Sequence, residues 1–408
     1  MYRVIIFVLF FSLAKNIFAQ DSLNSKTVED STYRLYQSKN WRGLISLGNK
    51  ALDNGFDYYY LRLRIGISYY EQKNYREAQK QFWKAYLFNS TDDVLMEYLY
   101  YCYIFNMQYD EARKLSKKFS STLVEKLKTN KSPWIDYLFL ESGIKTTDKP
   151  DLSDAYYGQF GFGHRVGKNI SFFHAITLFD QNSQSSDLNQ KQYYLCANIP
   201  VSKSWLISPA FHLIDRTITF KPQVYPPWVI LPPGILAIPP PSTKNYYVGS
   251  VAITKSISKF DIGIGATYSN IDSMTQVQGN ISLSYFPFGN NKLFFTSIGY
   301  IQQESVSPDY KYAFSQSVSV SPFSKLILSA NYFYNQAHHI SEMNGYLANN
   351  SNDLTTSRIT FTTNFILSRH LNFYLLYQLE NKSQNNPQNN TTTNYSYNNV
   401  FGGLKFIL

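Results

Sequence analysis

The sequence predicts two domains, an amino-terminal α-helical array and a 14-stranded antiparallel transmembrane β-barrel. Three observations support this fold class: a 34-residue repeat in the first part, a change of composition near Pro133, and fourteen short runs of alternating apolar and polar residues in the second part. We expect a signal peptide over residues 1–19, a periplasmic helical domain over 20–130 and the barrel over 134–408.

The first 19 residues have the composition of a secretory signal. Arg3 is a basic start, Val4 to Leu13 is an apolar run too short to span a bilayer as a helix, and Ala19 is a small residue at the expected cleavage point. The rest of the sequence has no run of about 18 apolar residues, which excludes a helical inner-membrane protein. A soluble periplasmic protein and a barrel are the remaining alternatives.

A repeat of 34 residues organises the helical part. Trp41, Tyr75 and Tyr109 are 34 residues apart. Two further sets keep this spacing: Leu44, Ala78 and Ala112, and Ala51, Ala85 and Phe119. In stacked helix pairs, small residues let paired helices approach, and a single pair cannot bury its apolar face alone. The repeat therefore predicts about six helices between residues 26 and 128.

This repeat resembles the tetratricopeptide repeat. The middle copy matches that family's Gly, Tyr, Tyr, Ala, Phe and Ala positions with Gly66, Tyr69, Tyr75, Ala78, Phe82 and Ala85. The flanking copies depart from the pattern, with Gly48 where an aromatic residue belongs and Tyr100 where glycine belongs. The resemblance implies that the helices dock a periplasmic partner protein. The alternative is a small array that only packs under the barrel as a plug or brace.

The helices also carry more aromatic residues than the repeat requires. Rigid aromatic side chains give contact area at low entropic cost, so Tyr58, Tyr59 and Tyr101 are candidate partner-binding residues wherever they are exposed. The alternative for each of them is a place in the core.

Alternation assigns a face to each strand, because successive side chains of a strand point to opposite sides. In residues 276–285, the apolar face contains Val277, Ile281, Leu283 and Tyr285, and the polar face contains Gln276, Gln278, Asn280, Ser282 and Ser284. Residues 259–268 and 358–367 alternate in the same way. We expect the apolar faces to contact outer-membrane lipid and the polar faces to line the lumen.

The links between strands alternate between short and long, as expected for periplasmic turns and external loops. The longest links are residues 219–243, 344–354 and 382–394. The six short links each carry or adjoin a basic residue: Lys168, Lys203, Lys259, Lys292, Lys325 and Arg369. With 38 basic and 28 acidic residues the chain has a formal charge of +10. Export argues against nucleic acid as a partner, so we interpret these cations as a solvated rim or as a docking surface for an acidic partner.

The predicted lumen is lined mainly by short polar side chains, which leave a barrel of this size partly open unless a loop folds into it. Four charged residues also face inward: Asp261, Arg358, Glu380 and Lys405. They do not form a ring of one sign. This disfavours an ion-selective porin and favours a neutral polar conduit or an inert anchor.

One loop is unusually apolar. Residues 219–243 are rich in proline and contain Tyr225, Trp228, Ile230, Leu231, Ile235 and Leu236. Such a segment is unfavourable in water, and its prolines stiffen it into extended pieces. We expect it to act as a lid or to hold a second outer-membrane protein or a surface lipoprotein.

No catalytic or metal-binding motif stands out in the sequence. Cys102 and Cys196 lie in different predicted domains, which makes a disulfide between them improbable. His338 and His339 are adjacent in a predicted outer loop, but the six histidines lack zinc-site spacing. We expect no cofactor, no metal and no enzymatic activity.

The organisation resembles bacterial outer-membrane barrels with an amino-terminal periplasmic tetratricopeptide domain, as in exopolysaccharide export proteins and YaiO-like barrels. Its aromatic-rich and Asn-rich composition is similar to that of Bacteroidota proteins. The resemblance implies a non-enzymatic outer-membrane component whose repeats recruit a periplasmic partner, as an accessory or anchor of an assembly, secretion or export complex. The alternative is a conduit for exporting a neutral polymer such as a polysaccharide.

Overall fold

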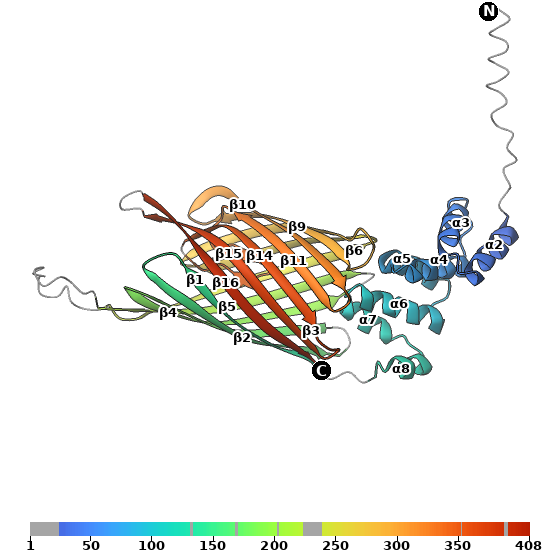
Figure 1. Ribbon diagram of the computed structural model, residues 1–408, viewed down its shortest axis with the longest axis horizontal. Coiled ribbons are helices and arrows are strands. Elements are labelled where there is room, and N and C mark those ends of the chain that lie inside the picture. The colour runs from blue at the N-terminus through green and yellow to red at the C-terminus, as the bar shows by residue number, and fades with distance from the viewer. Residues whose placement is uncertain are drawn as a thin grey trace, which may run out of the picture. The chain divides into compact units, whose positions relative to one another are not determined.

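The computed structural model describes residues 24–130, 134–167, 170–201, 204–222, 239–351, 353–386 and 391–408. Over these ranges the chain forms seven helices and a closed barrel of fourteen strands (Figure 1). It divides into two compact units, the first ending at Leu99 and the second running from Tyr100 to Leu408. The expected signal peptide and the apolar part of the Pro-rich loop, from Tyr225 to Leu236, lie outside the described residues.

The helices repeat with the period seen in the sequence. They are α2 (Ser25–Gln37), α3 (Trp41–Asp53), α4 (Tyr59–Glu71), α5 (Tyr75–Phe88), α6 (Asp93–Phe105), α7 (Tyr109–Ser116) and α8 (Ser121–Leu127). The starts of α2, α4 and α6 are 34 residues apart, and so are those of α3, α5 and α7. Membership of the tetratricopeptide family stays a prediction. Within the described ranges, no helix is long and apolar enough to cross a membrane.

The turn before each second helix also repeats. Lys39, Lys73 and Met107 have φ of 54°, 60° and 60°, and this left-handed residue ends the preceding helical segment. The next residue starts the following helix in two of the copies, where the side chains of Asn40 and Asn74 accept N–H bonds from the first turn. The helix boundaries therefore repeat every 34 residues, as the core positions do.

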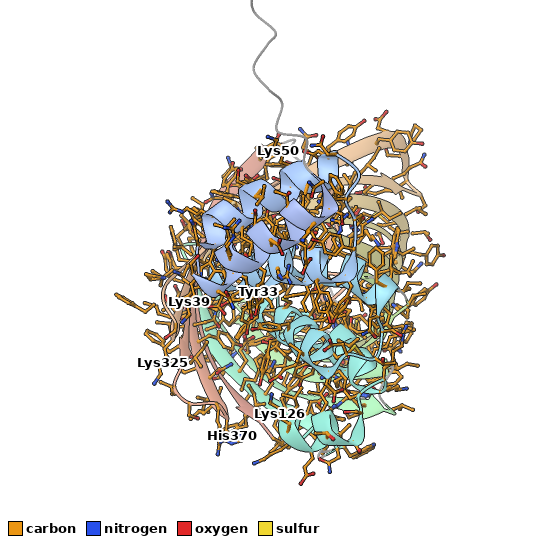
Figure 2. All side chains as sticks on the ribbon, turned by 90° about the vertical axis from the view of Figure 1, so that its right-hand side faces the viewer. Tyr33, Lys39, Lys50, Lys126, Lys325 and His370 are labelled. Carbon is orange, nitrogen blue, oxygen red and sulfur yellow. The ribbon has the colours of Figure 1, made fainter. Side chains whose placement is uncertain are left out.

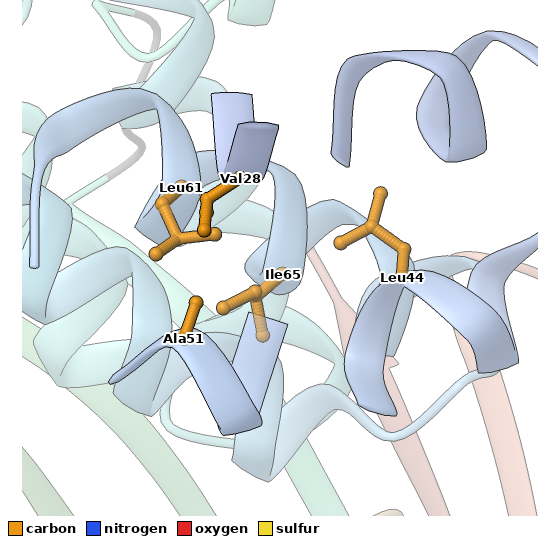
Figure 3. Packing of buried hydrophobic residues seen from close by; sticks show 5 residues of the cluster. All are labelled: Val28, Leu44, Ala51, Leu61 and Ile65. Carbon is orange, nitrogen blue, oxygen red and sulfur yellow. The ribbon is translucent and has the colours of Figure 1, made fainter. Parts of the chain in front are cut away.

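The first unit has its own apolar core. Val28, Leu44, Ala51, Leu61 and Ile65 are fully buried and pack together (Figure 3). These residues come from α2, α3 and α4. Single helix pairs do not bury such faces, so the stacking of successive pairs makes this core.

A second close contact explains the glycine of the middle repeat. A Cβ atom at Gly66 would lie 2.5 Å from the ring of Phe82, which is itself fully buried. Glycine therefore allows α4 and α5 to approach over this ring.

The barrel strands are β1 (Ile135–Thr147), β2 (Leu152–Val166), β3 (Ile170–Ser183), β4 (Ser186–Pro200), β5 (Trp205–Phe220), β6 (Ser242–Ile257), β7 (Phe260–Ile271), β8 (Met274–Tyr285), β9 (Leu293–Glu304), β10 (Ser307–Phe323), β11 (Leu326–Asn335), β14 (Leu354–Ile366), β15 (Leu371–Asn386) and β16 (Thr391–Ile407). Each pairs antiparallel with its neighbours, and β1 pairs with β16 from Tyr137↔Ile407 to Thr147↔Tyr397 (Figure 1). The predicted strand count and closure are confirmed.

The predicted facing of the strands is also confirmed. Val277 and Ile281 of β8 are 58% and 61% exposed on the outside, whereas Gln276 and Gln278 are 1% and 3% exposed in the lumen. Large apolar residues of β7 and β14 are exposed outside in the same way. An apolar outer face on a barrel without edges defines the class of transmembrane β-barrels of the outer-membrane type.

The prediction that one end carries only long loops is wrong for three links. Residues 184–185, 272–273 and 305–306 are two-residue turns. Asp272 and Ser273 have φ of 54° and 65°, the pair of positive angles that matches the twist of a tight hairpin. The strands simply continue further than the alternation indicated. We call this end the long-loop end and the other the short-turn end.

The rim of the short-turn end is basic where it is described. Lys325, in the turn between β10 and β11, and His370, next to β15, lie on this rim (Figure 2). Lys168 and Lys203 lie outside the described residues. Cys102 of α6 and Cys196 of β4 are free thiols.

Lipid facing can be tested at Ile281. Ile281→Arg is expected to destabilise the barrel in bilayers by about 2–4 kcal/mol, because it places a charge on the lipid face. Ile281→Met, with a long neutral side chain, is the control and should change stability by less than about 1.5 kcal/mol. Reversible urea unfolding in liposomes measures both. Equal effects of the two substitutions would show that Ile281 does not face hydrocarbon.

Candidate functional site

A long loop at the long-loop end folds into the lumen. This inner loop, residues 336–351, connects β11 to β14 and contains the short hairpin of β12 (Ser341–Glu342) and β13 (Leu347–Ala348). At its tip Met343, Asn344 and Gly345 all have positive φ. A Cβ at Gly345 would lie 3.0 Å from Ser250 Oγ, so glycine suits both the backbone angle and the close approach to β6.

Hydrogen bonds hold the inner loop across the barrel. The Gln278 side chain pairs with both backbone groups of Ser341, at 2.7 Å to its carbonyl and 3.0 Å from its N–H. On the other side, the Tyr346 hydroxyl donates to Gln159 of β2. In the barrel order, four strands separate β2 from β11 on one side and eight on the other. The loop therefore crosses the lumen.

The tip of the hairpin is fixed to β5 and β6. Ser250 Oγ donates to the Asn344 carbonyl at 2.7 Å, and the Asn344 amide donates to the Ser208 carbonyl at 2.7 Å. His212 Nδ1 donates to the Gly345 carbonyl at 2.9 Å. The loop tip is therefore held by one short inward side chain, Ser250, by the His212 ring and by the backbone of Ser208.

Two apolar clusters inside the lumen support the inner loop. Ile340 and Ala337 of the loop pack with Tyr300, Ala313 and Phe333 of the wall. Ala348 packs against a second cluster made of Ile214, Tyr246, Val248 and Ile271. His338 and His339 lie in a loop at the predicted end of the barrel, but this loop folds inward: His339 is buried, and Gln302 Nε2 donates to the His338 carbonyl at 2.6 Å. The apolar loop residues and matching wall residues favour the inward position.

A cavity of about 740 Å³ remains between the inner loop and the wall. Its wall comes from β1 to β5 and β14 to β16. Aromatic side chains line it: Phe139, Tyr157, Phe179, Tyr194, Tyr346, Tyr374, Tyr395, Tyr397 and Phe401. Amide side chains lie between them, including Gln159, Gln181, Gln190, Gln192, Asn349, Asn350, Asn364, Gln378 and Asn399. The size is that of a typical small-molecule site.

Charged residues also line the cavity, and they pair with one another. Arg358 Nη2 lies 2.7 Å from a Glu342 carboxylate oxygen. Glu380 accepts from Lys145 at 3.2 Å and lies 3.6 Å from Lys382 Nζ. Breaking such buried pairs costs about 3–5 kcal/mol, because the remaining charge stays in a poor solvent.

The structure separates the four charged residues predicted for the lumen. Arg358 and Glu380 are register partners on β14 and β15 and line the cavity. Lys405 lies elsewhere, with Nζ 3.8 Å from the centre of the Tyr137 ring. Asp261 begins β7 near the short-turn end, opposite Ser256 and Ser284. Their functional roles stay predictions.

Sequence reasoning missed most of the cavity. Lys145, Lys382 and Glu342 were not recognised, because neither the strand alternation nor a motif marks which inward charges will meet. One local signal was present: the Asn344-Gly345 pair is a typical hairpin turn. It indicates a hairpin, but not that the hairpin points into the lumen.

The predicted partner-binding tyrosines are half-buried. The Tyr59 hydroxyl donates to Asp92 at 2.6 Å, and Tyr58 packs against the core of the first unit. Tyr101 stacks on Phe105 with ring centres 6.1 Å apart. Tyr60, which was not selected, is 57% exposed. The other candidate contacts, Tyr225, Trp228, Ile230, Leu231, Ile235 and Leu236, lie outside the described residues.

Helix α7 contacts the short-turn end of the barrel. Lys114 Nζ donates to the carbonyls of Pro200 and Val201 beside β5. Gln108 Nε2 donates to Ser256 Oγ at 2.8 Å, and Asn291 donates to the Phe105 carbonyl at 2.8 Å. Three different turns thus hold residues 105–114, and this segment lies against the mouth of the barrel.

A carboxylate in this contact has an altered acidity. Burial, with smaller contributions from the nearby carboxylates of Asp110 and Asp261, raises the pKa of Glu111 to about 7. The folded pKa lies above the usual 4.5. The neutral form therefore stabilises the docked helix fully below about pH 4.5, and this contribution is lost as the pH rises through 7.

Comparisons with known proteins identify no family for this chain. No family model and no curated protein matches the sequence. Among solved structures, the Ralstonia pickettii toluene transporter TbuX is similar over 68% of this chain and 90% of that one, with 9% identity and a TM-score of 0.45. The P. putida toluene transporter TodX is similar over 67% of this chain and 90% of that one, with 8% identity and a TM-score of 0.42. A Pseudomonas aeruginosa FadL homologue is similar over 67% of this chain and 90% of that one, with 6% identity and a TM-score of 0.41. With TM-scores below 0.5, these similarities establish neither a family nor a function for this chain.

The pH dependence of helix α7 is testable by hydrogen exchange. Between pH 5 and pH 8 the opening free energy of its amides, corrected for intrinsic exchange, is expected to fall by about 1–3 kcal/mol. Glu111→Gln should remove most of this fall, because it has no proton to lose. Glu125→Gln changes an exposed carboxylate of α8 and should leave the fall intact. A wild-type profile that is flat over this range would contradict the assignment to Glu111.

Proposed function

We propose that this chain is a gated outer-membrane barrel that passes or holds a small polar solute, with the inner loop as its gate. The observation that carries the proposal is the inner loop itself, which crosses the lumen and leaves a lined cavity beside it. Each of its hydrogen bonds contributes about 0.5–1.5 kcal/mol, so the loop is held by many weak contacts. Loss of a few of them is enough to shift such an equilibrium.

The charges of the cavity favour a channel over an inert anchor. Arg358, Glu342, Glu380 and Lys382 are all buried or nearly so. Apolar side chains of similar size would fill an anchor's lumen without the desolvation cost of these ions. In a channel, these charged residues would contact the polar solute that enters the lumen.

The conduit for a neutral polymer remains the alternative for the same lumen. A polymer needs a continuous opening, so the inner loop would have to leave the lumen completely. Its two apolar clusters and its hydrogen bonds to β5, β6 and β8 oppose complete release. A small solute needs only a local displacement, and we therefore rank it first.

Docking of a periplasmic partner on the helices is a second proposal. Tyr33 and Tyr60 are 47% and 57% exposed, and the Arg64 guanidinium lies 5.1 Å and 5.8 Å from their ring centres. Arginine and tyrosine are enriched in the energetic centres of interfaces, which supports a contact here. The periplasmic location of the helices and the absence of enzymatic activity stay predictions from the sequence.

The gate can be tested at Gln278. Gln278→Leu removes two bonds to Ser341, worth about 1 kcal/mol each, and is expected to raise the open probability by about tenfold or more in planar bilayers. Gln276→Leu is the matched control on the same strand, since among the described residues the Gln276 side chain bonds to Ser269 and to the Ile271 carbonyl and not to the inner loop. It should leave the open probability within about twofold.

A larger change makes the test independent of any single bond. Replacing residues 341–348 with a short Gly-Ser linker removes the hairpin while β11 and β14 remain. The barrel should then show a higher unitary conductance than the wild type. Unchanged conductance in this variant, once its barrel is verified by heat-modified gel mobility, would refute the loop as a gate.

A further inference from the structure

One amide that lines the cavity has no hydrogen-bond partner among the described residues. Asn399 of β16 faces the lumen and lines the cavity, and it is 1% exposed. Over the described residues, neither its amide nitrogen nor its amide oxygen makes a hydrogen bond. Its register partners are Lys145 and Gln378 on the two neighbouring strands. Leaving both atoms unpaired costs free energy, which a ligand with an adjacent donor and acceptor would recover.

Half-buried aromatic rings line the same cavity, and the nearest along the chain is Phe401, two residues after Asn399 on β16. Tyr157 and Phe401 meet edge to face with ring centres 5.4 Å apart, and Phe139 and Tyr374 stack at 5.8 Å. All four line the cavity. Rings of this kind present flat apolar faces in a wall whose other members are amides. A suitable ligand therefore has a flat apolar face and polar groups around its edge.

The charge balance of the cavity indicates a neutral ligand. Five cations line it, Lys145, Lys149, Arg216, Lys382 and Arg358, against four carboxylates, Glu141, Glu342, Asp353 and Glu380. Four ion pairs join them, with N–O distances from 2.7 Å to 3.6 Å. With so little net charge, neither an anion nor a cation gains much on entry, and an ionic ligand would compete with existing pairs.

A hydrocarbon fits this cavity poorly. It would leave the buried Asn399 amide unpaired, and it would cover Gln378 and the ion pair of Glu380 with Lys145 without offering them a hydrogen bond. Covering a polar group in this way costs about 1–3 kcal/mol for each group. Hydroxyl groups, which both donate and accept, would instead satisfy the amides.

We propose that the cavity is a binding site for a neutral saccharide, with a sugar ring against the aromatic wall and neighbouring hydroxyls on the Asn399 amide. A pyranose ring has an apolar C–H face and a rim of hydroxyls, the two features that the wall matches. The volume of about 740 Å³ is within the range of small-molecule sites. This inference deepens the proposed channel function and rests on it, because the sugar would be the small polar solute that the barrel passes or holds.

The test is calorimetric titration of the full chain in detergent micelles. The probes are three neutral sugars, cellotriose, maltotriose and chitotriose, with trigalacturonate as the anionic comparison and toluene as the apolar one. At least one neutral sugar is expected to bind with a dissociation constant of about 1 mM or tighter. Binding of toluene or trigalacturonate alone, or of no probe, would overturn the proposal.

Asn399→Leu and Asn398→Leu are matched variants on opposite faces of one strand. Asn398 points outward and is exposed. Asn399→Leu should weaken sugar binding tenfold or more, whereas Asn398→Leu should leave it within about twofold. Asn399→Leu should also leave the unfolding midpoint of the ligand-free barrel equal or higher, because the amide has no partner there. A lower midpoint together with unchanged sugar affinity would show that Asn399 is only structural.

The two proposals fail separately. If Gln278→Leu opens the barrel but no neutral sugar binds, the channel stands and the saccharide site falls. If a neutral sugar binds and Asn399→Leu weakens it while removal of the inner loop leaves the conductance unchanged, the site stands and the gate falls.

Discussion

Closure of the sheet by pairing β1 with β16 is the constraint on which the second unit depends. In hydrocarbon every backbone N–H and C=O must find a partner within the protein, and an open edge would leave a full row unpaired. Eleven successive register pairs, from Tyr137↔Ile407 to Thr147↔Tyr397, satisfy that row. Closure also creates an inside, so that the inward residues of all strands face one another across a shared space.

The inside is filled by tertiary packing, and the inner loop supplies most of it. Apolar side chains of the loop complete two clusters on the wall, and amides of β2, β4 and β8 bond to its backbone or side chains. The remaining space is lined by paired ions, amides and aromatic rings. Burying these ions costs desolvation energy, and the proposal of a polar neutral solute rests on this lining.

At the short-turn end, helix α7 adds a second boundary to the same lumen. Its contacts are a lysine and a glutamine on backbone and hydroxyl oxygens and a half-buried carboxylate, Glu111. Polar contacts of this kind are individually weak, so a helix held by them can move more readily than a strand of the barrel. The inner loop at one side of the cavity and the polar contacts of α7 at the mouth are the two features on which the proposed gating depends.

The sequence by itself determined what is local and periodic. Strand facing follows from a period of two, and the helix starts follow from a period of 34, so Ile281, Gln278, Tyr75 and Tyr109 lie where the pattern placed them. Only the tertiary structure decided that Lys145 meets Glu380, 235 residues away, and that Tyr346 reaches Gln159, 187 residues away. Such contacts depend on the register of the fourteen strands in the closed barrel. They also depend on the inner loop being buried against the lumen wall instead of being exposed to water. Strand register and loop position each depend on contacts between residues far apart in the sequence, and a local sequence pattern does not reveal such contacts.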